Sequence, residues 1–355
     1  MSEPALFRHL PALAARVPWQ PLGVWPTPVT AAEVAGRTLW VKHEGASHPT
    51  YGGNKLRTLE AWFGHARATG ARTIWAIGAY GSNHAIATVL HAPAAGLAAG
   101  AIVFPQPPSP WARENAGALI ATGCPIVCLR SVLELPFAAA WVALRAPDAL
   151  VMPPGGATPI GTLGAASAAF ELAEQVAAGV LPAPRRIVVA AGSTCTAAGL
   201  LAGLQLARVS GAWRWPVPRV HAVRVTPWPV TSRAAIVQLA ARTLARVAAL
   251  GGPVVAHGLG RLLAMLTVDG REIGEGYGQP TARGEAAAAA LVMTGARLDG
   301  VYAAKAAAAL LRLHARDEGP LLLWATKSDA TLAAPSAAAL RAGPPALVRW
   351  LARAA

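Results

Sequence analysis

A lysine that follows two glycines and an asparagine is the first candidate for chemistry. Lys55 stands in YGGNKLRTLE (51–60), in a chain whose 31 basic residues include only four lysines. Arginine stays protonated, whereas a lysine with a lowered pKa is a nucleophilic amine that forms a Schiff base with an aldehyde. Gly52 and Gly53 would let the backbone pass close to a bulky ligand. A glycine turn before a surface lysine is the alternative, and this stretch alone does not exclude it.

The stretch GAYGSNHA (78–85) has the composition of an anion site. It follows an expected buried strand and begins an expected helix, where free backbone N–H groups and the positive helix end bind a carboxylate or a phosphate. Side-chain donors are added by Ser82, Asn83 and His84. A simple helix cap would explain Ser82 or Asn83, but it would not explain the glycines in front of them.

A second possible anion site is AAGSTCTAAGL (190–200), again a strand, a turn of small residues and a helix. Amides and hydroxyls around one point suit a phosphate, and here they come from Gly192, Ser193, Thr194 and Thr196. The stretch matches neither the P-loop nor the Rossmann glycine pattern. A capped helix after a core strand remains the alternative.

Two of the four tyrosines lie in glycine-containing stretches, Tyr277 in GEGYGQP (274–280) and Tyr302 in LDGVYAAK (298–305). Each tyrosine by itself would be explained as a packing or turn residue. Taken together, however, an amine for an aldehyde, a carboxylate site, a phosphate site and tyrosines fit pyridoxal phosphate holding an amino acid.

Strand and helix patterns alternate along the chain and must position these residues. Buried strands are expected at 37–44, 72–79, 98–105, 124–129 and 185–192, with helices at 54–69 and 82–97. This alternation predicts an α/β fold with open, mostly parallel sheets that carry helices on both faces. A chain of 355 residues favours two lobes, and the Gly- and Pro-rich stretch 152–164 predicts the boundary between them.

Composition excludes several other classes of protein. The net charge is +14, but the arginines are scattered and no nucleic-acid motif is present, so no nucleic-acid partner is expected. No uninterrupted apolar stretch reaches the length of about 18 residues that a membrane helix needs, so no membrane partner is expected either. The first residues lack a signal-peptide pattern, which predicts a cytoplasmic protein.

The cysteines and histidines do not predict a metal site. Three cysteines cannot all pair within the chain, and Cys124 and Cys128 lie in an expected buried strand, where they are explained as small core residues. No His/Cys group has the spacing of zinc ligands.

The order and wording of the four motifs resemble the D-cysteine desulfhydrase and 1-aminocyclopropane-1-carboxylate (ACC) deaminase family, within the tryptophan-synthase-β-like, fold type II enzymes. The resemblance runs from PLGVWPTPV (21–29) to about Thr326. It implies a larger domain that binds pyridoxal phosphate, residues 1–49 plus 156–355, and a smaller domain inserted in it, residues 50–155. It also implies a small amino-acid substrate and a homodimer.

The resemblance also implies roles for individual residues. Lys55 is the expected Schiff-base lysine with Asn54 beside it, and Asn83 is expected to hydrogen-bond the 3-hydroxyl oxygen of the cofactor. Backbone amides of residues 82–84 are expected to take the substrate carboxylate, with Ser82 placed to handle protons. The amides of 192–196 are expected to hold the phosphate, Thr326 to face the pyridine nitrogen, and two tyrosines to line the substrate side: Gly192, Ser193, Thr194, Cys195 and Thr196, with Tyr277 and Tyr302.

Within that family the residues favour desulfhydrase chemistry. His84 stands where ACC deaminases have Gln, and Ala303 stands where they have a Glu that keeps the pyridine nitrogen protonated. The expected reaction is α,β-elimination from a small β-substituted amino acid, which gives a 2-oxo acid and ammonia. Lys55 would act as the base at Cα, assisted by Ser82 or Tyr277.

The chain also departs from the desulfhydrase pattern. It reads ATKS (325–328) for HTGG, VYAAK for VYTGK and GSTCTAAGL for GSGGTHAGL, so Lys327 and Ser328 replace glycines expected to lie close to the cofactor ring. Two alternatives therefore stay open. One is β-replacement that builds a specialised amino acid, and the other is a homologue that binds the cofactor without turnover.

Overall fold

The computed structural model describes residues 3–256, 258–316 and 319–353 and contains two sheets. The larger sheet has the strand order β1-β2-β10-β7-β8-β9, and the smaller has β5-β4-β3-β6. Every strand pair is parallel except β1–β2. The expected α/β fold with mostly parallel sheets is therefore confirmed. The strands are β1 (Val29–Val34), β2 (Arg37–His43), β3 (Thr73–Ala79), β4 (Ala98–Phe104), β5 (Ile126–Cys128), β6 (Ala149–Met152), β7 (Arg186–Ala191), β8 (Arg219–Arg224), β9 (Leu266–Asp269) and β10 (Leu321–Ala325).

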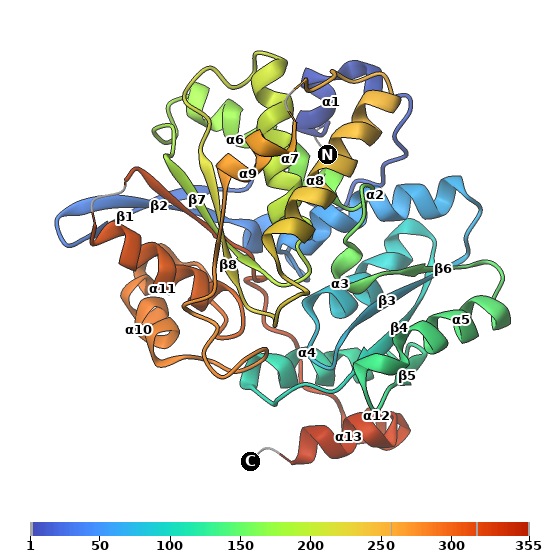
Figure 1. Ribbon diagram of the computed structural model, residues 1–355. Coiled ribbons are helices and arrows are strands. Elements are labelled where there is room, and N and C mark those ends of the chain that lie inside the picture. Colours follow the sequence, from blue (N-terminus) through green and yellow to red (C-terminus); the bar gives the residue numbers. More distant parts are fainter. Residues whose placement is uncertain (1–2, 257, 317–318, 354–355) are drawn as a thin grey trace.

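Helices cover both faces of the larger sheet (Figure 1). Within the described ranges they are α1 (Ala5–His9), α2 (Asn54–Ala68), α3 (Asn83–His91), α4 (Pro110–Ala121), α5 (Leu135–Arg145), α6 (Thr162–Ala177), α7 (Cys195–Val209), α8 (Arg233–Ala249), α9 (Leu259–Met265), α10 (Ala282–Ala290), α11 (Ala303–His314), α12 (Ala337–Ala342) and α13 (Pro345–Ala352). None of these helices is both long and apolar enough to cross a membrane. In the same ranges no three His, Cys, Asp or Glu side chains are grouped so that they could hold a metal ion.

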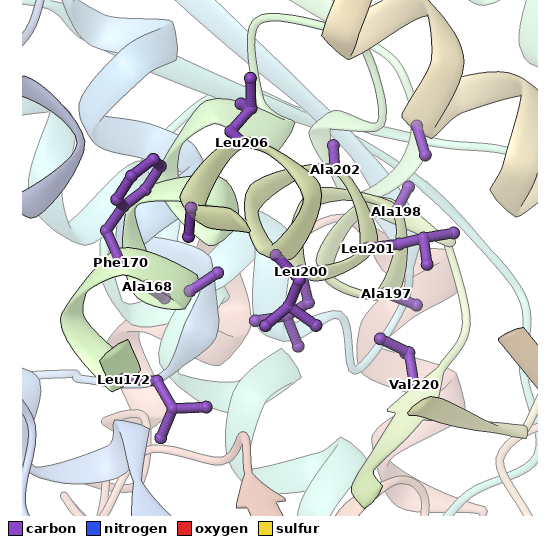
Figure 2. Close-up of a cluster of buried hydrophobic side chains, with 14 of the residues drawn as sticks. Ala168, Phe170, Leu172, Ala197, Ala198, Leu200, Leu201, Ala202, Leu206 and Val220 are labelled. Carbon is purple, nitrogen blue, oxygen red and sulfur yellow. The ribbon is translucent and has the colours of Figure 1, made fainter. Parts of the chain in front are cut away.

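The core of the larger sheet follows the alternation of side chains along β7. Ile187 and Val189 face the cluster formed with α6, α7 and α8, whereas Val188 and Ala190 face the cluster under α10 and α11. Figure 2 shows Leu200 of α7 in the first cluster, together with side chains from α6 and β8. A strand buried on both faces reads as a continuous apolar run, which is why the sequence pattern identified β7.

The other expected elements are confirmed within a few residues at each end. The helix expected at 82–97 is α3, which ends at His91 and continues as a 3₁₀ turn, Ala92–Ala95, around Pro93. Proline has no N–H to continue the helix. The strand expected at 124–129 forms, but it is the short edge strand β5 and is not buried. Cys124 and Cys128 are consequently only half-buried, which corrects their expected place in the core.

The smaller sheet has its own apolar clusters. One face packs with α3 and α4, and the other packs against α5 through Trp75 and Ile102. The C-terminal helix α13 joins the first of these clusters through Leu347 and Trp350. The division into 1–49 plus 156–355 and 50–155 stays a prediction, and its ends at residues 1–2 and 354–355 lie outside the described residues.

The carboxyl ends of three parallel strands position the candidate residues. β3 leads into α3 at Ser82, β7 leads into α7 through 192–194, and β10 ends directly before Thr326. In open α/β sheets, ligands bind in the crevice outside the carboxyl ends of the strands. The expected turns therefore lie where a ligand site is expected.

Candidate active site

A cavity of about 570 Å³ lies where the ends of the two sheets meet. Every candidate residue from the sequence contributes to its wall: Asn54, Lys55, Ser82, Asn83, His84, Gly192, Ser193, Thr194, Cys195, Thr196, Tyr277, Tyr302 and Thr326. Apolar side chains such as Phe104, Leu135 and Val230 complete the wall. The structure thus brings together residues from all four motifs, although it does not by itself assign a task to any of them.

Lys55 lies in the first turn of α2 and is the lysine of this cavity. Of the four lysines in the chain, all within the described residues, Lys55 alone lines the cavity. Burial lowers the pKa of its amine, and the neighbouring Cys195 acts weakly in the opposite direction. A lowered pKa increases the fraction of neutral, nucleophilic amine.

The remaining lysines are held by other partners. Lys42 Nζ lies 2.6 Å from Glu171 Oε1 in a buried ion network, and Lys305 Nζ donates to the carbonyl oxygens of Ile273 and Gly276. Lys327 points away from the cavity, into the part of the molecule that contains α3 and α4. The expectation that Lys327 would occupy space beside the cofactor ring is therefore wrong.

Gly52 and Gly53 serve the packing of the chain against itself. Gly53 has φ +104°, and a Cβ built on it would lie 2.7 Å from the carbonyl oxygen of Thr326. A Cβ on Gly52 would lie 2.1 Å from the carbonyl oxygen of Gly45. Neither glycine lines the cavity. They let the start of α2 approach the end of β10, which corrects the expectation that they make room for a ligand.

Gly155 is the close approach that the sequence did not reveal. It has φ +66°, and a Cβ built on it would lie 2.1 Å from Ser193 Oγ and 3.3 Å from Lys55 Nζ. The composition of 152–164 predicts only a lobe boundary. A pair of glycines directly after a strand was the available signal, because the same arrangement marked the other cavity turns.

The start of α3 already uses part of its hydrogen-bonding capacity. Ser82 Oγ caps the helix by accepting from the amides of His84 and Ala85, both at 3.2 Å, and the Ser82 amide donates to the Ala79 carbonyl oxygen. A carboxylate on the amides of 82–84 would therefore have to replace the Ser82 hydroxyl at the helix end. This role of residues 82–84 stays a prediction.

His84 presents an unpaired imidazole to the cavity. Both ring nitrogens are buried without a hydrogen-bond partner among the described residues. Burial holds the pKa of His84 well below its usual value, and the charge of Lys55 adds to this effect. A buried polar group without a partner costs free energy, so the neutral ring is available to a polar group of a ligand.

The turn before α7 forms a cradle of donors. Thr194 precedes the helix with φ +70°, a conformation that a glycine adopts freely and a threonine rarely does. The first amides of a helix have no partner within it and bind anions. Thr196 Oγ1 accepts a 2.8 Å hydrogen bond from Asn54 Nδ2, which ties this turn to the start of α2. The loss of two glycines here has left the cradle in place.

Two tyrosine hydroxyls meet at the cavity wall. Tyr277 Oη and Tyr302 Oη are 2.6 Å apart, and their rings pack edge to face. Burial raises the pKa of both tyrosines. Both hydroxyls consequently stay protonated at neutral pH and can donate a proton or a hydrogen bond.

A polar cluster beside the cavity was not expected from the sequence. Lys327 Nζ lies 3.0 Å from Asn83 Oδ1, 3.0 Å from Asn115 Oδ1 and 3.2 Å from Tyr51 Oη. The chain has only three asparagines, Asn54, Asn83 and Asn115, and all three lie at the cavity or in this cluster. The rarity of asparagine was the signal that could have identified Asn115.

Taken together, the wall offers an amine for an aldehyde, a donor cradle for a phosphate and an unpaired imidazole. The steric limit at Gly155 keeps the space between Lys55 and Ser193 open. These features fit pyridoxal phosphate, whose aldehyde reacts with lysine and whose phosphate binds helix amides.

Known proteins with similar sequences carry the same cofactor chemistry. A family model described as pyridoxal-phosphate dependent enzyme matches residues 21–323. Over 198 residues the chain is 38% identical to nocardicin C-9' epimerase of Nocardia uniformis subsp. tsuyamanensis, which is 54% of this chain and 60% of the epimerase. Over 305 residues it is 28% identical to D-cysteine desulfhydrase of Klebsiella pneumoniae (strain 342), which is 81% of this chain and 85% of the desulfhydrase.

Solved structures agree with this relationship. The crystal structure of an ACC deaminase homologue matches with a TM-score of 0.72 at 26% identity, covering 93% of this chain and 96% of that one. A bacterial-strain threonine deaminase, designated T.th., matches with a TM-score of 0.59 at 18% identity, a likeness of fold. Because the family model covers most of its length, this chain belongs to the family of pyridoxal-phosphate dependent enzymes, and pyridoxal phosphate is its cofactor.

Proposed function

We propose that this enzyme removes the Cα proton of a small amino acid that carries a leaving group on Cβ, and that it eliminates this group to give a 2-oxo acid and ammonia. The observation that carries the proposal is the place of Lys55, the single lysine of the cavity, with a pKa lowered by burial. Similarity to a D-cysteine desulfhydrase over four fifths of the chain supports a small thiol amino acid as substrate.

The residues of the cavity would divide the work. When bound, pyridoxal phosphate supplies an electron sink for negative charge at the substrate Cα. Lys55 first holds the cofactor aldehyde, and its amine then takes the Cα proton once the substrate amine has replaced it. The hydroxyl pair of Tyr277 and Tyr302 lies at hand to protonate the departing group, and Ser82 stands where the substrate carboxylate would bind.

The proposed reaction balances without an oxidant or reductant. The Cα proton goes to Lys55, and the bond from Cβ to its substituent breaks with the electron pair on the substituent. The substituent leaves as its protonated form, a thiol or hydrogen sulfide for cysteine-like substrates. One water then converts the released product into the 2-oxo acid and ammonia.

The first test is spectroscopic. Wild-type protein with pyridoxal phosphate is expected to show the visible absorption of a lysine-bound cofactor, and borohydride should abolish it. Lys55→Arg keeps the positive charge without a nucleophilic amine, so it should lack this absorption, as Lys55→Ala should. Persistence of the absorption in Lys55→Arg would show that another amine holds the cofactor and would overturn the assignment.

The second test identifies the reaction by its products. D-Cysteine and L-cysteine are each incubated with the enzyme, and 2-oxo acid, ammonia and sulfide are quantified. Elimination predicts the three products in equal amounts from one enantiomer without an added nucleophile. Release of sulfide only when a nucleophile is added, with no 2-oxo acid, would favour β-replacement. A cofactor absorption that no amino acid changes would favour a homologue without turnover.

Epimerisation is a second candidate, and the 38% identity to nocardicin C-9' epimerase favours it. It begins with the same removal of the Cα proton, but a proton then returns to the opposite side and the β-substituent stays. In deuterated water, epimerisation predicts deuterium at Cα and the mirror-image product without ammonia. Formation of 2-oxo acid and ammonia from the same substrate would decide for elimination.

A further inference from the structure

Lys327 joins two parts of the molecule that come together only in the folded chain. It follows β10 of the larger sheet by two residues, and its side chain is 2% exposed. Its three oxygen partners belong to the other side of the cavity: Tyr51 precedes α2, whereas Asn83 and Asn115 lie on α3 and α4, beside the smaller sheet. The ammonium therefore connects the end of β10 to helices that pack on the smaller sheet.

The contacts of Lys327 determine which way the Asn83 amide points. An ammonium has three donors and no acceptor, so the Asn83 atom 3.0 Å away has to be the oxygen. Tyr51 Oη and Asn115 Nδ2 donate to the same oxygen, at 2.7 Å and 2.8 Å. The Asn83 N–H groups are thereby left on the opposite side of the amide.

The surroundings of Asp299 agree with this orientation. Burial raises the pKa of the Asp299 carboxyl, whereas the charge of Lys327 and hydrogen bonds, one of them from the Asn83 side chain, act to lower it. A hydrogen bond from Asn83 to a carboxylate requires its nitrogen on that side. One N–H of Asn83 remains for the cavity, which Asn83 also lines.

We infer that Lys327 is a positioning residue for the cofactor. It fixes the Asn83 amide so that an N–H donor faces the cavity, and it fixes α3 and α4 relative to Thr326 at the end of β10. Asn83 and Thr326, two residues of the cavity wall, are thus held at a set separation by the side chain that directly follows Thr326. The inference goes beyond the proposed reaction, because it concerns only the chain and the cofactor.

The three asparagines of the chain make a direct test possible. Protein labelled with ¹⁵N only at asparagine gives three side-chain amide signals, those of Asn54, Asn83 and Asn115. In cofactor-free Lys327→Met, we expect the Asn83 and Asn115 signals to shift and their hydrogens to exchange faster with water. The Asn54 signal should stay unchanged, because Asn54 bonds to Thr196 on the α7 side of the cavity.

Cofactor binding is the second readout and needs no amino-acid substrate. The dissociation constant of pyridoxal phosphate is expected to rise about tenfold in Lys327→Met, since hydrogen bonds to charged groups are stronger than neutral ones. Lys305→Met is the matched control, because Lys305 is also buried but donates to the backbone carbonyls of Ile273 and Gly276. It should leave the Asn83 and Asn115 signals in place.

A third variant keeps the test decisive if Lys327→Met does not fold. Lys327→Gln retains polar contacts of similar reach, but its amide matches either orientation of Asn83. We expect it to fold, to show exchange of the Asn83 signal and to weaken cofactor binding. Wild-type cofactor affinity with unshifted Asn83 and Asn115 signals in Lys327→Gln would overturn the inference. Equal shifts in Lys305→Met would also overturn it, because loss of any buried lysine would then be sufficient.

Discussion

At the scale of single residues, Lys55 and Lys327 show how surroundings separate two identical side chains. Burial lowers the pKa of both amines. Lys55 faces the cavity, where a neutral amine can react, whereas three oxygen atoms surround Lys327 and stabilise its ammonium form. The first is suited to chemistry and the second to fixing its neighbours.

The lowered pKa of Lys327 predicts a dependence of stability on pH. Burial lowers this pKa to about 8, with Asp299 and Glu114 opposing the shift and Arg297 adding to it. Lysine in the unfolded chain titrates at about 10.4. Between pH 8 and pH 10 the unfolded state therefore binds more protons than the folded state, so the contribution of Lys327 to stability rises with pH.

The measurement is the free energy of unfolding of wild type minus that of Lys327→Met, from denaturant titrations at pH 7, 8, 9 and 10. This difference is expected to increase above pH 8 and to be flat below it. Taking the difference cancels the titration of all other groups to first order. A difference that stays constant up to pH 10 would contradict a lowered pKa for Lys327.

At the scale of elements, the start of α2 is held by ion pairs that reach into α6. Glu171 of α6 accepts from Lys42 Nζ at 2.6 Å and from an Arg57 nitrogen at 3.0 Å. Arg57 also pairs with Glu44. Against the raising effect of burial, the charges of Arg57 and Lys42 lower the pKa of Glu171 to about 2. Arg57 lies two residues after Lys55, so this network fixes the helix that carries the reactive amine.

Removal of Glu171 is expected to destabilise the fold strongly. Glu171→Ala leaves two buried cations without their shared partner, which costs about 3–5 kcal/mol. Glu174→Ala is the control on the same helix, because Glu174 pairs with the partly exposed Arg8, and such pairs contribute at most about 1 kcal/mol. Denaturant unfolding measures both variants. Equal losses in the two variants would mean that the buried network does not stabilise α2.

The cap of α3 allows structure and chemistry to be separated. Ser82 caps α3 and Ser109 caps α4, each with Oγ accepting a backbone amide at 3.2 Å. Ser82→Ala and Ser109→Ala should each lose about 1 kcal/mol of stability, as N-cap removal does. Turnover, measured well below the unfolding temperature, should fall only in Ser82→Ala. A similar fall in both would reduce Ser82 to a cap.

At the scale of the whole molecule, the cavity exists because two sheets present their strand ends to each other. The segment between β6 and α6 passes from the smaller sheet to the larger, and Gly155 in this segment contacts both Lys55 and Ser193. Any side chain there would close the space between the α2 and α7 turns. Gly155 is thus a requirement of the assembled cavity that neither sheet imposes alone.

Gly155→Ala is expected to weaken cofactor binding beyond its cost in stability. The new methyl group would collide with Ser193 Oγ, and φ +66° strains any residue with a Cβ. Gly179→Ala has the same backbone strain, at φ +73°, but meets open space. Both should lose about 1 kcal/mol or more in thermal unfolding, and titration with pyridoxal phosphate should show reduced affinity only for Gly155→Ala. Unchanged affinity would mean that the turn yields without disturbing the site.

The sequence alone determined the secondary structure, the fold class and the identity of the candidate reactive lysine. Apolar periodicity, helix caps and glycine turns are local properties, which is why β7, α2 and the turns at 82–84 and 192–196 were predicted from short windows. The motif order also predicted the cofactor, which the match to the family model confirmed.

Only the tertiary structure decided what lies behind those motifs. Lys327 contacts Tyr51 across 276 positions of sequence and Asn115 across 212. Side-chain direction at such distances depends on how the two sheets pack, so the sequence pattern could not show that Lys327 points away from the cavity and bridges its two sides. For the same reason Gly52 and Gly53 proved to accommodate the end of β10, and Gly155 proved to keep the cavity open.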